Sequence, residues 1–173
     1  MALTVPVIKK FDTTSKVTSV SSGVNLSFSQ LDGKLVVGNQ EIKIESITSI
    51  GEFPQGEMLV GCTDGLHCFK GVEESWGVPY ETGIESIIVG SNEAVVVDGL
   101  GKGHLYNSKG SHLLSFPEES ILFVSIGERV AIATEAGLVS TYSLEGEKEW
   151  ERPVRGDIGE RITAIGWDQT ILI

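Results

Sequence analysis

Residues 121–150 read ILFVSIGERVAIATEAGLVSTYSLEGEKEW and hold one complete copy of a repeat that decides the fold. The copy opens with Ile121-Leu-Phe-Val124, continues with Val130-Ala-Ile-Ala133 and turns at Ala136-Gly137. Two further short runs follow, and the second closes on Trp150. Short runs rich in β-branched residues, separated by glycine-containing turns, are typical of β-strands. We therefore expect four strands in each copy.

The opening phrase of this copy recurs along the chain. It consists of a β-branched residue, two further residues and another Val or Ile, and a glycine follows within three residues. The five phrases begin at Val17, Ile47, Ile84, Ile121 and Ile162. Four antiparallel strands about every 40 residues are typical of one blade of a β-propeller. The sequence has no helical periodicity, so it predicts an all-β fold, a β-propeller of four-stranded antiparallel blades.

The repeats predict a single domain over residues 1–173. We expect complete units at approximately 17–46, 47–83, 84–120 and 121–161, and a partial fifth unit at 162–173. Proline lacks the N–H that a central strand needs, so it is typical of edge strands. The predicted fourth strands end near Pro79, Pro117 and Pro153, which indicates that these strands form the outer edge of each blade.

Residues 1–16 are expected to form a closing outer strand and a linker. In that arrangement the N-terminal strand completes the partial fifth unit and gives a closed five-bladed ring. The alternative is that the units are part of a larger propeller, either cut from it or completed by another chain. Either arrangement would cover the apolar segment Ile171-Leu-Ile173, which would promote aggregation if its edge stayed unpaired.

The fourth unit resembles the repeat of quinoprotein-type (PQQ-like) propellers, in which a strand leads to Gly-Lys-x-x-Trp. Gly146 and Trp150 have the spacing of that motif. The chain departs from the family pattern at Ser140 and Tyr142, where the docking motif has Ala and Asp, and at Glu147, where it has Lys. The opening phrase with its glycine is equally similar to a divergent WD40 unit. Both resemblances imply propeller blades, and neither brings a cofactor with it.

The charge of the chain limits the classes of partner. It has 13 Lys and Arg against 24 Asp and Glu, a formal net charge of −11 at pH 7. Nucleic acids and anionic membrane surfaces are bound through clustered basic residues, which this sequence lacks, so we expect neither as a partner. Residues 1–11 lack the basic region of a signal peptide, and no apolar run approaches the ~20 residues of a membrane span. We therefore expect a cytoplasmic protein.

Two short stretches resemble ligand sites. Cys62 and Cys68 flank an Asp64-Gly65 turn, with His67 between them. Successive residues of a strand point to opposite faces, so His67 and Cys68 cannot both join Cys62 around a metal ion. The segment Gly99-Leu-Gly-Lys-Gly103 lacks the Ser or Thr and the helix of a phosphate-binding loop, and it predicts a hairpin turn. We expect no metal and no cofactor.

No linear motif indicates catalysis. The three histidines, His67, His104 and His112, fall in or near predicted third and fourth strands, away from the strands that line a propeller axis. Neither Gly-x-Ser-x-Gly nor His-Glu-x-x-His occurs. We identify no catalytic residue, and a non-enzymatic protein is favoured over an enzyme.

The predicted function is a scaffold for protein–protein interaction. The expected contact face consists of the loops between blades and the turns between second and third strands. The candidate interaction residues are Asp12, Asp32, Asp64, Lys102, Glu135, Arg152, Arg155, Asp157 and Arg161. We expect a protein partner, with self-association or completion of the ring by another chain as further forms. The alternative is a small-ligand-binding or enzymatic propeller that uses an axial pocket, as the quinoprotein resemblance implies.

Overall fold

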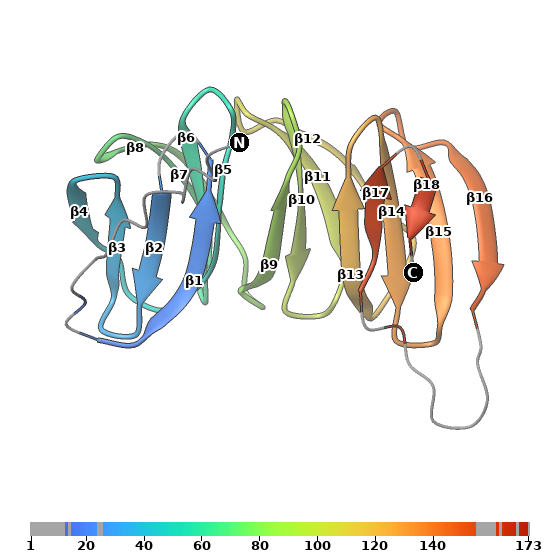
Figure 1. Cartoon of the computed structure of the whole chain (residues 1–173), viewed down its shortest axis with the longest axis horizontal. Helices are drawn as coiled ribbons and strands as arrows, with labels where there is room; N and C mark the ends of the chain where they lie inside the picture. Colours follow the sequence, from blue (N-terminus) through green and yellow to red (C-terminus); the bar gives the residue numbers. More distant parts are fainter. Residues whose placement is uncertain are drawn as a thin grey trace, which may run out of the picture.

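The computed structural model describes residues 13, 15–23, 26–154, 162, 164–168 and 170–172. Every regular element among these residues is a β-strand, from β1 to β18. The strands form sheets that follow one another in chain order, as the colours in Figure 1 trace. The predicted all-β class is therefore confirmed.

Within the described residues the strands form four four-stranded sheets and one two-stranded sheet. The first sheet consists of β1 (Val17–Ser22), β2 (Leu26–Gln30), β3 (Lys34–Val37) and β4 (Gln40–Lys43). The second consists of β5 (Ile47–Glu52), β6 (Glu57–Cys62), β7 (Gly65–Lys70) and β8 (Glu73–Pro79). The third consists of β9 (Ile84–Val89), β10 (Glu93–Asp98), β11 (Gly103–Asn107) and β12 (His112–Ser115). The fourth consists of β13 (Ile121–Ile126), β14 (Arg129–Thr134), β15 (Leu138–Ser143) and β16 (Lys148–Pro153), and the last of β17 (Gly166–Asp168) and β18 (Thr170–Leu172).

Each four-stranded sheet is an antiparallel meander in which consecutive strands pair. The first strands of successive sheets, β1, β5, β9, β13 and β17, contact one another in chain order, whereas β4, β8, β12 and β16 are edge strands. This is the arrangement of propeller blades, with the first strand innermost and the fourth outermost. We call the four-stranded sheets blades 1 to 4. The predicted fold of four-stranded antiparallel blades is confirmed.

The four blades share one register at the start of their first strands. The opening residue of the first strand pairs with the last residue of the second strand, and a β-bulge follows directly. The four pairs are Val17–Gln30, Ile47–Cys62, Ile84–Asp98 and Ile121–Thr134. Because the pairing repeats, a residue in one blade has a defined equivalent in the others.

The same register continues across the third and fourth strands. His67 of blade 2 is equivalent to His104 of blade 3, because each pairs with a valine two residues before the end of the second strand. On its other side His67 pairs with Gly77, and His104 pairs with Ser115. Gly77 and Ser115 are therefore equivalent positions on the outer strands.

The hydrophobic core lies between neighbouring blades. Leu35 of β3 packs with Met58 and Val60 of β6 between blades 1 and 2. Leu59, which points to the other face of β6, packs with Val96 between blades 2 and 3. Alternate residues of one strand thus belong to two different cores, and burying each of these side chains contributes about 1.5–3 kcal/mol.

The outer strands also link adjacent blades. Trp76 of β8 donates its indole Nε1–H to the Ser108 carbonyl of blade 3, with an N···O distance of 3.3 Å. Its ring stacks on Tyr106 with the ring centroids 6.4 Å apart. Pro79 and Pro153 are the last residues of β8 and β16, where the missing N–H disturbs no central ladder.

The predicted closing strand falls outside the described residues. Residues 1–12 and 14 of the segment assigned to that strand and its linker are not among the residues that the structure describes. Closure of the ring by the N-terminal strand therefore stays a prediction.

Candidate interaction face and its polar networks

The turns between second and third strands lie against the connections between blades at one end of the molecule. Backbone hydrogen bonds join the two sets of loops. They run from Ile44 N to Gly33 O (2.8 Å), Tyr80 N to Asp64 O (3.0 Å), Gly99 N to Gly83 O (3.0 Å), Ile121 N to Gly101 O (3.0 Å) and Glu135 N to Ser120 O (2.9 Å). We call this end the turn face, which comprises turns 31–33, 63–64, 99–102 and 135–137, connections 44–46, 80–83 and 116–120, and the first two residues of β13, 121–122.

The glycine-rich stretch 99–103 supplies the turn between β10 and β11 and the first residue of β11. A Cβ on Gly99 would lie 2.0 Å from the Thr82 carbonyl oxygen. Gly101 has a φ of 74°, and a Cβ there would lie 2.9 Å from the Cα of Ser120. Glycine is needed at both positions because the turn is packed between two inter-blade connections.

The candidate interaction residues divide into three groups. Asp32, Asp64, Lys102 and Glu135 lie on the turn face and are exposed. Arg152 instead lies on the outer strand β16, where its guanidinium is 5.7 Å from the centroid of the Trp150 ring. Asp12, Arg155, Asp157 and Arg161 lie outside the described residues.

The turn face also exposes large apolar side chains that the sequence analysis did not single out. Among the described residues, the three most exposed leucines are Leu31 (72%), Leu100 (63%) and Leu122 (50%). Leu31 and Leu100 stand in turns, and Leu122 follows Ile121 at the turn-face end of β13. For Leu31 and Leu100 the available signal was an apolar residue placed beside Asp-Gly or Gly-rich turn residues, and Leu122 had no such signal.

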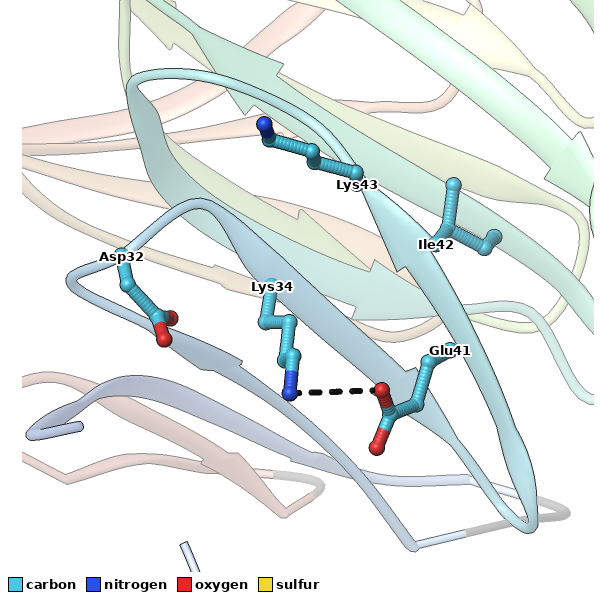
Figure 2. Close-up of a pocket in the computed structure, with 5 residues that line it drawn as sticks. All are labelled: Asp32, Lys34, Glu41, Ile42 and Lys43. Carbon is cyan, nitrogen blue, oxygen red and sulfur yellow. Dashed lines mark ion pairs between the residues drawn. The ribbon is translucent and has the colours of Figure 1, made fainter. Parts of the chain in front are cut away.

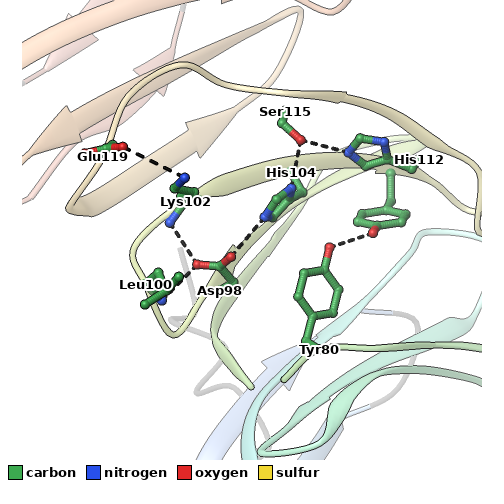
Figure 3. A network of polar contacts seen from close by, with 9 residues as sticks. Tyr80, Asp98, Leu100, Lys102, His104, His112, Ser115 and Glu119 are labelled. Atoms are coloured by element: carbon green, nitrogen blue, oxygen red, sulfur yellow. Dashed lines mark hydrogen bonds and ion pairs between the residues drawn. The ribbon is translucent and has the colours of Figure 1, made fainter. Parts of the chain in front are cut away.

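A chain of polar side chains ties blade 3 together beneath this face (Figure 3). Asp98 Oδ2 lies 3.2 Å from His104 Nε2, and His104 Nδ1 lies 2.9 Å from Ser115 Oγ. Ser115 Oγ is also 3.1 Å from His112 Nε2. The other carboxylate oxygen of Asp98 accepts the backbone N–H groups of Leu100 and Lys102.

The carboxylate of Asp98, at one end of this network, determines which nitrogen of His104 donates a hydrogen bond. Burial would raise the pKa of Asp98, but hydrogen bonds from Lys102 N–H, His104 and Leu100 N–H outweigh it and hold the pKa below its ordinary value. An ionised carboxylate only accepts hydrogen bonds, so His104 donates Nε2–H to Asp98. Burial and the neighbouring His104 lower the pKa of His112, which favours its neutral form.

The chain Asp98–His104–Ser115 has the residue types of a nucleophile relay, and no linear motif revealed it. Its three members come from β10, β11 and β12, and they meet only because the register places them side by side. In the structure it anchors the turn at Leu100 and holds the three strands together. Tyr80 from the preceding connection packs on His104 with the ring centroids 5.4 Å apart.

A second network anchors the connection between blades 3 and 4. Glu118 is buried, accepts the Tyr142 hydroxyl proton and lies 3.1 Å from Lys148 Nζ. Burial would raise the pKa of Glu118, but hydrogen bonds from Tyr142 and Lys148 lower it below its ordinary value. Burial and the bond to Glu118 raise the pKa of Tyr142 to about 12. The connection is thus held to β15 and β16 by a charged hydrogen-bond cluster.

Blade 2 brings together groups that could hold a metal ion. Ligand atoms of Cys62, Asp64 and His67 lie within 4.8 Å of one another. Cys68 is on the opposite face of β7, as the sequence alternation predicted, because it packs in the core with blade 3 while Cys62 packs in the core with blade 1. Both thiols are free.

Blade 1 carries an open recess of about 250 Å³ along its outer strands (Figure 2). Its lining residues are Asp32, Lys34, Glu41, Ile42 and Lys43. Lys34 Nζ lies 3.4 Å from Glu41 Oε2, and this ion pair spans the recess wall formed by β3 and β4. Asp32 lies both in the lining of this recess and on the turn face.

Comparison with known proteins identifies the fold. No protein-family model and no curated protein matches the chain. Solved structures that do match include BamB from Moraxella catarrhalis (TM-score 0.65, 14% identity, 84% of this chain and 52% of that chain). A second is the N-terminal domain of Nup159 (TM-score 0.65, 11% identity, 87% of this chain and 50% of that chain). A third is the β-propeller domain of Cps50 (Swd1) from Myceliophteria thermophila (TM-score 0.67, 12% identity, 86% of this chain and 58% of that chain).

At these identities the matches show the fold alone, and that fold is the β-propeller. The chain covers 50–58% of the length of these three solved structures. In the portion of the chain placed by the structure, no helix has the length and apolar character to cross a membrane.

Proposed function

We propose that this chain is a scaffold for protein–protein interaction that binds its partner through the turn face. The supporting observation is the exposure of Leu31, Leu100 and Leu122 on a backbone fixed by hydrogen bonds between turns and connections. Single exposed leucines are ordinary on protein surfaces. Three on one fixed face can become buried on binding without a large cost in backbone ordering.

The charges around these leucines define the chemistry of the partner. Asp32, Asp64 and Glu135 are exposed on the same face, and the chain as a whole carries a formal charge of −11. A complementary surface would place apolar pockets over the leucines and basic side chains around them. The proposed partner is therefore a protein with an apolar and basic surface.

The fold is consistent with this role. Propellers such as those of Nup159 and Swd1 share the architecture, in which rigid sheets hold loops on one face. Fold alone does not define function, so the proposal rests on the turn face. An axial-pocket ligand, quinoprotein-type character, cytoplasmic location and completion of the ring by another chain stay predictions.

Affinity capture with matched variants tests the proposal. The wild type is compared with the triple variant Leu31→Ser, Leu100→Ser, Leu122→Ser in extracts of the native cell, with bound proteins quantified by mass spectrometry. The control is Leu26→Ser, Val72→Ser, Leu113→Ser, which removes apolar side chains that are also exposed but lie outside the turn face. Circular dichroism and thermal melting establish that all three proteins are folded.

The expected result is a partner captured by the wild type and the control and lost from the turn-face variant. Binding of the purified partner should then weaken at least 10-fold in the turn-face variant, the size expected when interface anchors are truncated. Equal capture by both variants would place the contact surface elsewhere. Loss from both would mean that general surface hydrophobicity, not this face, retains the captured proteins.

A further inference from the structure

Blade 2 holds three potential metal ligands at the end of its β6–β7 hairpin. Ligand atoms of Cys62, Asp64 and His67 lie within 4.8 Å of one another, and His67 Nε2 is 3.5 Å from Asp64 Oδ1. Two ligand atoms that each lie about 2.1 Å from a tetrahedral zinc ion are about 3.4 Å apart. The imidazole and the carboxylate therefore already have the separation of two ligands of one ion.

The register explains why these residues meet. His67 pairs with Val60, and Cys62 lies two residues further along the same strand, so Cys62 and His67 share one face of the blade. Asp64 stands in the intervening turn. The alternation argument from sequence excludes a set containing both His67 and Cys68, but it leaves this set open because it did not include Asp64.

Glu74 holds the histidine in the orientation that a metal ligand needs. Its Oε1 lies 2.8 Å from His67 Nδ1. A Cβ on Gly77 would come within 2.8 Å of the same oxygen, so the glycine leaves the space that Glu74 occupies. A carboxylate that accepts Nδ1–H directs the Nε2 lone pair toward the other two ligands, and this arrangement recurs around zinc-bound histidines.

The charges in this cluster favour a cation. Glu74 lies on the Nδ1 side of the His67 ring and Asp64 on its Nε2 side, so two carboxylates flank the imidazole and attract a cation to it.

We propose that Cys62, Asp64 and His67 bind one divalent cation of the zinc class, with Glu74 as a positioning residue and a solvent molecule as the fourth ligand. Sulfur, imidazole and carboxylate donors together suit Zn²⁺ better than Mg²⁺ or Ca²⁺, which prefer oxygen. Binding replaces the Cys62 S–H bond by an S–Zn bond and releases one proton to solvent. The ion would join β6, β7 and their turn, and its binding does not depend on the proposed protein partner.

The test uses the full chain without an affinity tag, stripped of metal under reducing conditions. Co²⁺ serves as the spectroscopic probe, and Zn²⁺ is titrated by calorimetry and by displacement of Co²⁺. We expect one ion per chain, a thiolate-to-cobalt charge-transfer band and the intense visible bands of tetrahedral Co²⁺. Cys62→Ser should abolish the charge-transfer band, and Asp64→Asn and Glu74→Gln should each weaken Zn²⁺ binding roughly 10- to 100-fold.

Two controls separate this site from other donors. Cys68→Ala removes the thiol on the opposite face, and His112→Gln removes a histidine of blade 3; both should bind Co²⁺ with an unchanged spectrum. The proposal is overturned if wild-type protein gives no charge-transfer band, or if the band survives in Cys62→Ser. If Cys62→Ser fails to fold, Asp64→Asn provides the test, because the Asp64 side chain is 78% exposed. Unchanged Zn²⁺ affinity in Asp64→Asn would equally overturn the proposed site.

Discussion

Blades 2 and 3 place a histidine at the same position of the third strand but give it different surroundings. In blade 3, His104 lies between Asp98 and Ser115. In blade 2, His67 lies between Asp64 and Glu74. Both rings have an oxygen partner on each nitrogen, yet the partners come from different parts of the blade.

The last residue of the second strand accounts for the different surroundings of the two histidines. Blade 3 has Asp98 at that position, with its side chain 9% exposed and bonded to two backbone N–H groups as well as to His104. Blade 2 has Cys62 at that position, and the carboxylate beside its histidine belongs instead to Asp64 in the exposed turn. One register can thus support a closed structural network in one blade and an open ligand set in the next.

The largest expected effect on stability comes from removing the carboxylates of Asp98 and Asp64 one at a time. Asp98→Ala should lower the free energy of unfolding by about 3 kcal/mol, because it leaves His104 and two N–H groups without their acceptor in a buried place. Asp64→Ala should change it by less than about 0.5 kcal/mol, since that side chain is exposed. Urea unfolding followed by tryptophan fluorescence measures both.

Metal-free protein is the proper condition for this measurement, so that a bound ion does not add stability to blade 2. Similar losses in the two variants would contradict the distinction between a closed and an open network. If Asp98→Ala lowered the free energy of unfolding only slightly, water would readily replace the carboxylate of Asp98.

The strands were predictable from sequence because their signals are local. The phrases that begin at Val17, Ile47, Ile84 and Ile121 start β1, β5, β9 and β13, and the run at 130–133 falls inside β14. Each run combines β-branched residues with a nearby turn glycine, and both signals act within a few residues. The same locality explains why the outer position of Pro79 and Pro153 could be inferred.

The polar networks were not predictable because they depend on register across three strands. His104 meets Ser115 eleven residues away, and the ladder of β11 with β12 shifts directly after Leu105. A shift of one residue at that point would turn either side chain to the opposite face. Asp64 was identified as a turn residue, but its closeness to Cys62 depends on the path of the turn itself.

The pH dependence of stability offers a sharper test of the closed network. The pKa of Asp98 is held below its ordinary value of 3.8, so the folded state favours the ionised carboxylate. Its contribution is fully present above about pH 4 and is lost as the pH falls through the lowered pKa. Asp98→Asn should therefore flatten the acid limb of the stability curve, by at most ~1.4 kcal/mol per pH unit.

Glu118 titrates in the same direction, because its pKa is also lowered by hydrogen bonds. Glu118→Gln should remove a separate part of the acid dependence, and the two changes should add because the groups belong to different networks. Urea midpoints measured between pH 2.5 and pH 6 give the slopes. An acid limb that keeps its wild-type slope in Asp98→Asn would show that Asp98 does not carry the expected charge.

The smallest expected effects are at the outer-strand positions, Ser115 and Gly77. Ser115→Ala should lower the free energy of unfolding by about 1 kcal/mol, since it removes the hydroxyl that lies between His104 and His112. Gly77→Ala should change it by less than about 0.5 kcal/mol, because the added methyl displaces only the flexible end of Glu74 and alanine loses less backbone entropy than glycine on folding.

Nitrogen chemical shifts of the two histidine rings report the local change in each variant. The His104 shifts should change in Ser115→Ala, and the His67 shifts should change in Gly77→Ala. If His67 keeps its shifts in Gly77→Ala, Glu74 does not orient that ring, and the two blades differ less than the contacts indicate.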